Sequence, residues 1–174
     1  MKNSLLHRVY LGLGTNLGDR EEIIRKAVAL IGERVGQVVR QSSVIETEPW
    51  GFESANKFLN AVICCETTLT PRQLLETTQQ IERDMGRTKK SNHSPLNAQC
   101  PPSNAQRSPF NAQRSPFNVH RSTYTDRPID IDILLYDDIT VDEPDLKIPH
   151  PLMYQRDFVK IPLAEIKPDN DTPT

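Results

Sequence analysis

Runs of apolar residues change period along this chain, and the period predicts which elements form. Runs of β-branched and aliphatic residues predict four strands, over residues 8–13, 37–47, 58–66 and 127–136. Apolar residues at helical spacing predict two helices, over residues 20–33 and 71–85. A short return strand near 139–141 and a short helix over 152–158, which would expose Arg156, complete the pattern.

The order of these elements predicts the fold class. Strand, helix, two strands, helix and strand follow one another, as they do in ferredoxin-like topology. We therefore expect an α+β protein, a ferredoxin-like α/β sandwich in which helices cover a mostly antiparallel sheet. A chain of 174 residues is long enough for one domain with a proper core and short for two, so we expect residues 1–174 to form a single domain.

Composition changes after the second predicted helix. The unit NAQRSPF at residues 104–110 recurs unchanged at residues 111–117, and no acidic residue occurs from Arg87 to Thr125. A seven-residue period with a proline in each unit cannot form a coiled coil. Because the segment has few aliphatic residues to bury, we predict a disordered low-complexity insertion over residues 92–122.

The last long strand, RPIDIDILLY at residues 127–136, is the most informative stretch. Alternation places Asp130 and Asp132 on one face, which continues as Leu134 and Tyr136, while the opposite face is aliphatic: Ile129, Ile131, Ile133 and Leu135. The first face turns apolar after Asp132, so we expect the strand to be covered on both sides.

The two carboxylates of this strand need a positive partner. They would lie about 7 Å apart, where like charges repel by roughly 2 kcal/mol at an effective dielectric near 20. Two explanations remain open from these residues alone. One is a divalent cation such as Mg²⁺, which usually takes one or two carboxylates plus substrate phosphates. The other is an exposed strand end with Arg127 as its partner.

Bulk properties exclude some function classes. A formal net charge of −2 gives no bulk attraction to nucleic acid or to anionic membranes, and no apolar run reaches the length of a membrane span. Three cysteines, two of them adjacent, fit neither a disulfide framework nor a metal site, which favours reduced thiols in a cytoplasmic protein.

Several polar or aromatic residues have no evident structural duty. They include the two strand aspartates, several arginines, His150 between two prolines, and Asn60 inside a strand. An acidic pair with arginines is the profile of metal-assisted phosphoryl transfer. Trp50 follows Pro49 in a loop, where it could anchor the loop on the core or contact a substrate.

Six segments together resemble a known family. They are, in order, GLGTNLGDR, TEPWG, FLNAV, QQIERDMGR, DRPIDIDILLY and IPHPLMYQRDFVKIPLAEI. This order is similar to that of the 6-hydroxymethyl-7,8-dihydropterin pyrophosphokinases of folate biosynthesis, and only the insertion falls outside it. The resemblance implies transfer of the β,γ-diphosphate of ATP to the pterin hydroxymethyl oxygen, with release of AMP. We expect a monomer whose partners are these two small molecules, without nucleic acid or membrane.

The resemblance also implies roles for individual residues. Asp130 and Asp132 would hold two Mg²⁺ ions that bridge the triphosphate of ATP, and Arg87 and Arg127 would neutralise the charge that develops during transfer. The family's nucleotide-side positions correspond to Gln79, Glu82, Lys89, Ile133, His150 and Arg156. The pterin-side positions correspond to Thr47, Pro49, Trp50, Phe58, Asn60, Tyr124 and Phe158. Asn60 would read the pterin edge, and the two phenylalanines would sandwich its ring.

The chain departs from the family pattern at a few places. Many members have a tryptophan in the mobile loop before the Asp-x-Asp strand, where this chain has Tyr124. Pro151 replaces an aromatic residue after the histidine, and Asp145 replaces a basic one. Joining Ser91 to Thr123 would leave an ordinary family loop, so we hypothesise that residues 92–122 were inserted at a flexible tip.

Two alternatives of other classes remain. A nucleic-acid-binding module of the same topology could use the basic insertion as an arm, although such modules carry aromatic signature strands that this chain lacks. An inactive family member could act as a scaffold, although both aspartates and both arginines are retained.

Overall fold

A computed structural model describes residues 5–50, 53–87 and 128–167 of the chain. The first elements are β1 (His7–Thr15), α1 (Arg20–Arg34), β2 (Gln37–Gln41), β3 (Ile45–Thr47) and β4 (Phe58–Thr67). The remaining elements are α2 (Pro71–Asp84), β5 (Asp130–Tyr136), β6 (Val141–Glu143), β7 (Leu146–Ile148) and α3 (Asp157–Ile166). The predicted insertion over 92–122 lies outside the described residues.

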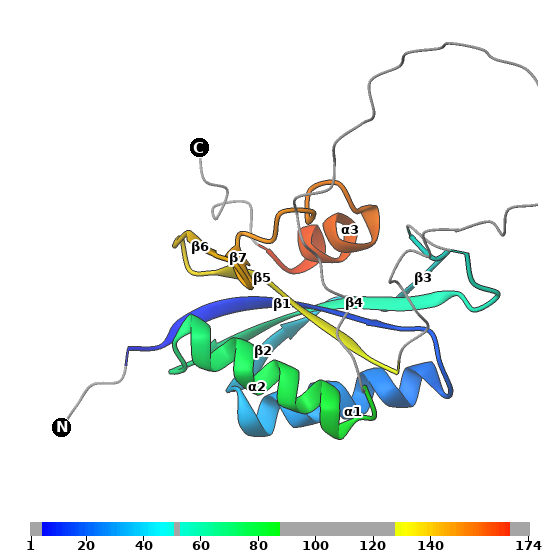
Figure 1. The fold of residues 1–174 in the computed structure, drawn as a ribbon, viewed down its shortest axis with the longest axis horizontal. Helices are drawn as coiled ribbons and strands as arrows, with labels where there is room; N and C mark the ends of the chain where they lie inside the picture. The colour runs from blue at the N-terminus through cyan, green and yellow to red at the C-terminus, as the bar shows by residue number, and fades with distance from the viewer. Residues whose placement is uncertain (1–4, 51–52, 88–127, 168–174) are drawn as a thin grey trace, which may run out of the picture.

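The main sheet has the strand order β2-β4-β1-β5, and β3 also pairs with β4. Every neighbouring pair in this sheet is antiparallel. Helices α1 and α2 cover one face of the sheet, and α3 covers the other (Figure 1). The α+β class and the ferredoxin-like order expected from the sequence are therefore confirmed. The hairpin of β6 and β7 forms a separate two-stranded sheet.

The single strand predicted over 37–47 is wrong, because it is divided into β2 and β3. At the break, the Oγ atom of Ser42 accepts a hydrogen bond from the backbone N–H of Val62 at 2.9 Å. The backbone N–H and the hydroxyl of Ser43 both donate to the Glu165 carboxylate on α3, at 2.9 and 2.8 Å. The serine side chains thus compete with the backbone hydrogen bonds between strands, and the first strand ends there.

The short helix predicted over 152–158 is also wrong. Residues 151–155 form turns, in which the N–H of Gln155 donates to the carbonyl of Leu152 at 3.1 Å. The helix starts only at Asp157 and continues to Ile166, because its aliphatic side chains pack on the sheet. Arg156, expected to be exposed, lies at the helix start and is buried.

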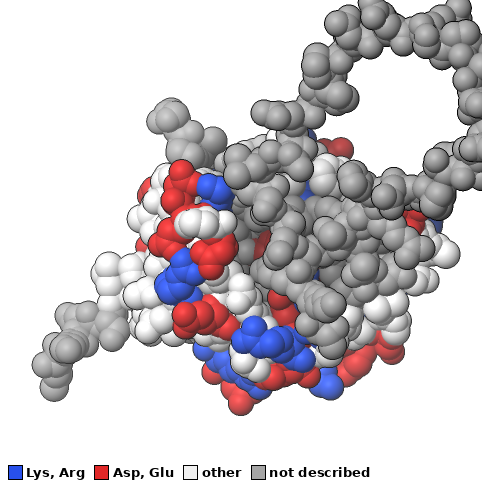
Figure 2. Space-filling view, in the orientation of Figure 1, with Lys and Arg blue, Asp and Glu red and all other residues white. Residues whose placement is uncertain are grey.

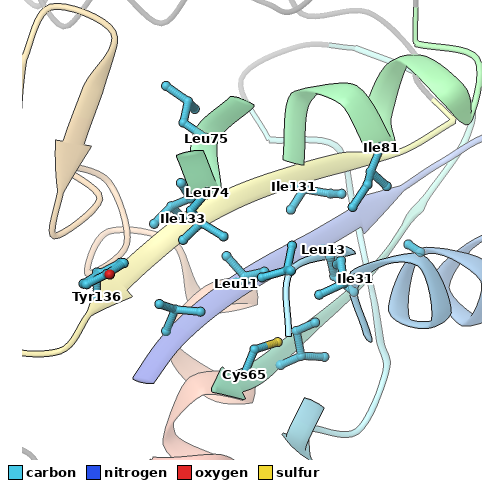
Figure 3. Packing of buried hydrophobic residues seen from close by; sticks show 14 of the residues in the cluster. Leu11, Leu13, Ile31, Cys65, Leu74, Leu75, Ile81, Ile131, Ile133 and Tyr136 are labelled. Atoms are coloured by element: carbon cyan, nitrogen blue, oxygen red, sulfur yellow. The ribbon is translucent and has the colours of Figure 1, made fainter. Parts of the chain in front are cut away.

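The core has two layers, one on each face of the sheet. Leu74 and Ile81 of α2 and Ile31 of α1 lie over the sheet residues Leu11 and Ile131 (Figure 3). A smaller layer lies between the sheet and α3: Tyr10, Val62, Cys64, Leu134, Leu135, Met153, Val159, Leu163 and Ile166. The expectation that β5 is covered on both sides is confirmed.

Strict alternation along β5 fails at Leu134. The pairing of β1 with β5 shifts between Tyr10 and Leu11, which leaves Leu134 as an extra residue. This β-bulge puts Leu134 and Leu135 together in the layer under α3. It returns Tyr136 to the opposite layer, where its hydroxyl donates to the carbonyl of Leu69 at 2.7 Å.

Cys64 and Cys65 are free thiols in the described part of the chain, and alternation on β4 points them into opposite core layers. Burial raises the pKa of Cys65 to about 12 and also raises that of Cys64. Both thiols are therefore protonated and unreactive near neutral pH.

Charges of both signs intermingle over the helices α1 and α2 on the face shown in Figure 2. Arg34 of α1 pairs with Asp84 of α2. Arg72 of α2 binds Asp145 with both terminal nitrogens, at 2.7 and 3.0 Å, which ties α2 to the loop before β7. None of the three helices within the described ranges is long and apolar enough to cross a bilayer.

Replacing Tyr136→Phe should destabilise the fold by about 1 kcal/mol, because the hydrogen bond to Leu69 is lost while the ring still fills the core. Urea unfolding measures this change. Tyr154→Phe is the matched control, since Tyr154 is 60% exposed. Equal unfolding midpoints for the two variants would contradict a stabilising role of the hydrogen bond between Tyr136 and Leu69.

Candidate active site

The carboxylates of Asp130 and Asp132 lie on one face of β5, beside a stretch of β1 that has little side-chain bulk. In the sheet register, Gly14 pairs with Asp130 and Gly12 pairs with Asp132. Because glycine leaves the sheet surface bare, a hollow of about 590 Å³, including its open mouth, forms there. Its lining comprises Gly12, Leu13, Gly14, Thr47, Glu48, Trp50, Phe58, Asn60, Ala61, Val62, Asp130, Asp132, Arg156, Phe158 and Val159.

Aromatic residues and one amide form the walls of this hollow. Phe58 and Asn60 come from β4, Trp50 from the loop after β3, and Phe158 from the first turn of α3. The Nδ2 group of Asn60 donates to the hydroxyl of Thr47 at 2.7 Å. Apolar walls with a single oriented amide suit a flat, polar-edged ring.

Arg87 neutralises the first aspartate. Its Nη1 atom is bonded to Asp130 Oδ1 and also to Glu82 Oε1, the latter at 2.7 Å. Burial opposes the charge of Arg87, but the carboxylates of Asp130 and Glu82 outweigh it and raise its pKa above the ordinary value. Arg87 is therefore a permanent cation inside the protein.

Arg156 neutralises the second aspartate. Its Nη1 atom lies 3.8 Å from Asp132 Oδ2. The guanidinium carbon lies 4.7 Å from the ring centroid of Trp50 and 5.6 Å from that of Phe158, which are cation–π distances. Each aspartate is thus paired with a different buried arginine, and the side chains of Asp130 and Asp132 are only 18% and 25% exposed. Arg127, the partner in the alternative explanation, lies outside the described residues.

The arrangement couples a carboxylate–arginine corner to an aromatic slot. Residues 10–98 and 106–168 match the family described as 7,8-dihydro-6-hydroxymethylpterin-pyrophosphokinase (HPPK). The chain belongs to the HPPK family. This confirms the family and the pyrophosphokinase class expected from the sequence motifs.

Relatives cover the chain almost from end to end. A Porphyromonas gingivalis protein named 2-amino-4-hydroxy-6-hydroxymethyldihydropteridine pyrophosphokinase is 43% identical over 161 residues, which span 92% of this chain and 90% of that protein. A Bacillus subtilis protein of the same name is 37% identical, over 90% of this chain and 76% of that protein.

Solved structures agree on the fold. A crystal structure of wild-type Plasmodium falciparum HPPK-DHPS with SDX-DHP superposes on 92% of this chain with a TM-score of 0.61 at 14% identity. This chain spans only 41% of that one. At such low identity the likeness supports the ferredoxin-like fold alone.

Eight of the site residues implied by the resemblance to the family line the hollow: Thr47, Trp50, Phe58, Asn60, Asp130, Asp132, Arg156 and Phe158. Trp50 is 41% exposed, so it contributes to the hollow and is not buried as a core anchor. Arg87 and Glu82 adjoin the hollow through Asp130.

Other predicted positions lie elsewhere or outside the described ranges. Ile133 packs in the core under α1 and α2, on the far side of the sheet. His150 does not line the hollow: its backbone N–H donates to Leu134 at 3.0 Å, and its Nδ1 accepts from the N–H of Leu152 at 3.2 Å. Gln79 and Pro49 are half-buried. Lys89, Tyr124 and Arg127 fall outside the residues that the structure describes.

Sequence reasoning missed the glycine floor. Gly12 falls at the end of the strand predicted over 8–13, and neither Gly12 nor Gly14 was singled out as part of a site. Their spacing of two within a strand was the available signal, because it places both on one face. An added Cβ atom at Gly14 would lie 3.1 Å from Asn60 Oδ1, whereas one at Gly12 would meet Leu134 at an ordinary 3.5 Å.

Proposed function

We propose that this chain transfers the β,γ-diphosphate of ATP to the hydroxymethyl oxygen of 6-hydroxymethyl-7,8-dihydropterin, giving AMP and the pterin diphosphate. One observation carries the location of this reaction: Asp130, Asp132 and Arg156 line the same hollow as the aromatic slot, and Arg87 adjoins it through Asp130. Phosphoryl transfer needs positioning and charge stabilisation more than covalent chemistry, and the corner supplies both.

The slot suits the pterin. Phe58 and Phe158 both line the hollow, and Asn60, held by Thr47, has amide groups that complement the amide-like edge of the heterocycle. Arg156 connects the slot to the aspartates, because its guanidinium contacts both the Trp50 ring and Asp132. The hydroxymethyl group of a seated pterin would then point toward Asp130 and Asp132, where the phosphates must arrive.

The donor set at the corner fits magnesium. Asp130 and Asp132 side chains are 18% and 25% exposed, so their oxygens are partly open to an incoming ligand. No group of three or more potential ligands occurs among the described residues, as expected for Mg²⁺ that completes its shell with water and substrate phosphates. When bound, the ions would polarise the phosphoryl oxygens as Lewis acids. We propose two ions, both held by this pair.

The chain's own groups do the rest. Arg87 and Arg156 reduce the repulsion between the two aspartates, and their positive charges would attract the triphosphate. We also propose Arg127 as a second charge-neutralising group and Lys89, Gln79 and His150 on the nucleotide side. Tyr124 and Pro49 remain proposals for the pterin side, and a cytoplasmic monomer remains the expected state.

Incubation of the chain with ATP, Mg²⁺ and hydroxymethyl dihydropterin should yield AMP and pterin diphosphate in equal amounts. Asp132→Asn should lower kcat at least about a hundredfold, because loss of one transition-state electrostatic contact typically costs that much. Asp138→Asn, at an exposed position in the turn after β5, is the matched control. Unaltered turnover in Asp132→Asn, with the fold intact, would remove this residue from the mechanism.

Gly14→Ala should raise the KM for the pterin about tenfold, or about 1.4 kcal/mol, with little change in the KM for ATP. The added methyl group would crowd the Asn60 amide at 3.1 Å and displace it. Gly12→Ala, whose methyl group makes an ordinary contact, should have a clearly smaller effect. Equal effects from both variants would mean that Asn60 does not read the pterin.

We further propose that residues 92–122 are a repeat-derived insertion that catalysis does not need. The repeated unit NAQRSPF supports the proposal. The family match omits residues 99–105 of this segment and covers the rest of it. Deletion that joins Ser91 to Thr123 should preserve or raise kcat in the AMP assay. A folded deletion variant without activity would refute it.

A further inference from the structure

Glu82 is the one acidic residue in the described part of the chain that is fully buried, with a side chain only 3% exposed. It lies near the C-terminal end of α2 and does not line the hollow. A buried carboxylate is costly unless charged and polar groups compensate it. Its partners therefore indicate what it does.

One oxygen of Glu82 connects two parts of the site. Glu82 Oε1 accepts a hydrogen bond from the backbone N–H of Ile131 at 2.8 Å and pairs with Arg87 Nη1 at 2.7 Å. Ile131 lies between the two aspartates on β5, which is the last strand on its side of the sheet in the described residues, so no described strand lies beyond it to accept its N–H. Glu82 accepts the hydrogen bond that a further strand would otherwise accept.

Arg87 is held from two sides. Its Nη1 atom is shared between Glu82 and Asp130, and its side chain is only 4% exposed. The backbone supports the same placement: Gly86, at φ +97, turns the chain, and the N–H of Arg87 donates to the Glu82 carbonyl at 2.9 Å. Asp130 is also the group that would turn its oxygens toward Mg²⁺.

We infer that Glu82 is a positioning residue: it keeps Arg87 beside the transferred phosphates when Asp130 engages the metal, and it fixes the backbone between the two aspartates. The role rests on the proposed function, and it replaces the direct nucleotide contact that resemblance implied for Glu82. Glu82 gives Arg87 a charged partner that is separate from the carboxylate that the metal needs.

Glu82→Gln tests this role because glutamine can still accept the Ile131 hydrogen bond but has no charge to hold Arg87. We expect kcat to fall about ten- to a hundredfold, as misplaced catalytic groups typically cause, with the KM for ATP within about twofold of wild type. AMP affinity, measured by calorimetry without metal, should stay unchanged. Glu76→Gln, at an exposed position on the same helix, is the matched control.

Several outcomes would overturn the inference. A nucleotide contact would instead raise both the Kd for AMP and the KM for ATP. A merely structural role would lower the thermal midpoint while kcat per folded molecule stayed at the wild-type value.

A double variant isolates the route through Arg87. In an Arg87→Ala background, adding Glu82→Gln should lower kcat no further, because the group that Glu82 positions is already gone. Independent, multiplying losses would overturn the inference. Wild-type chain that forms no AMP would overturn the proposed function and this role together, whereas an active wild type with an unaffected Glu82→Gln would overturn this role alone.

Discussion

Repulsion between two carboxylates on one short stretch of β5 is the constraint that the rest of the site accommodates. Neither aspartate could lie in a half-buried corner without a cation nearby. The two arginines that offset them come from helices on opposite faces of the sheet: Arg87 follows α2, and Arg156 precedes α3. The corner therefore exists only when both faces of the sheet are covered, which makes the three-layer fold a condition of the chemistry.

The hollow depends on a second constraint, the lack of side chains at two positions of β1. Gly12 and Gly14 pair with the aspartates across the sheet, and their bare surface leaves room between the sheet and α3. The neighbouring strand β4 fills the opposite side with Phe58 and Asn60. Charge and ring recognition thus occupy β5 and β4, the two strands that flank β1 in one sheet.

Local sequence patterns predicted much of this arrangement. The strand order followed from the element types, and the spacing of Asp130 and Asp132 correctly placed both on one face. Alternation failed at Leu134 because a bulge depends on the partner strand, which no single-strand pattern contains. The burial of Arg156 was missed for a similar reason: its partners Trp50, Phe158 and Asp132 come from three separate segments. The shared role of Glu82 likewise appears only when α2 meets the edge of β5.

The contact between Trp50 and Arg156 has a practical consequence. The chain contains a single tryptophan, and its indole ring lies under a guanidinium at the mouth of the hollow. A ligand that draws this cation away, or that stacks in its place, changes the surroundings of the sole indole. The protein therefore carries a built-in optical reporter, whose emission can follow the filling of the cavity without any attached dye.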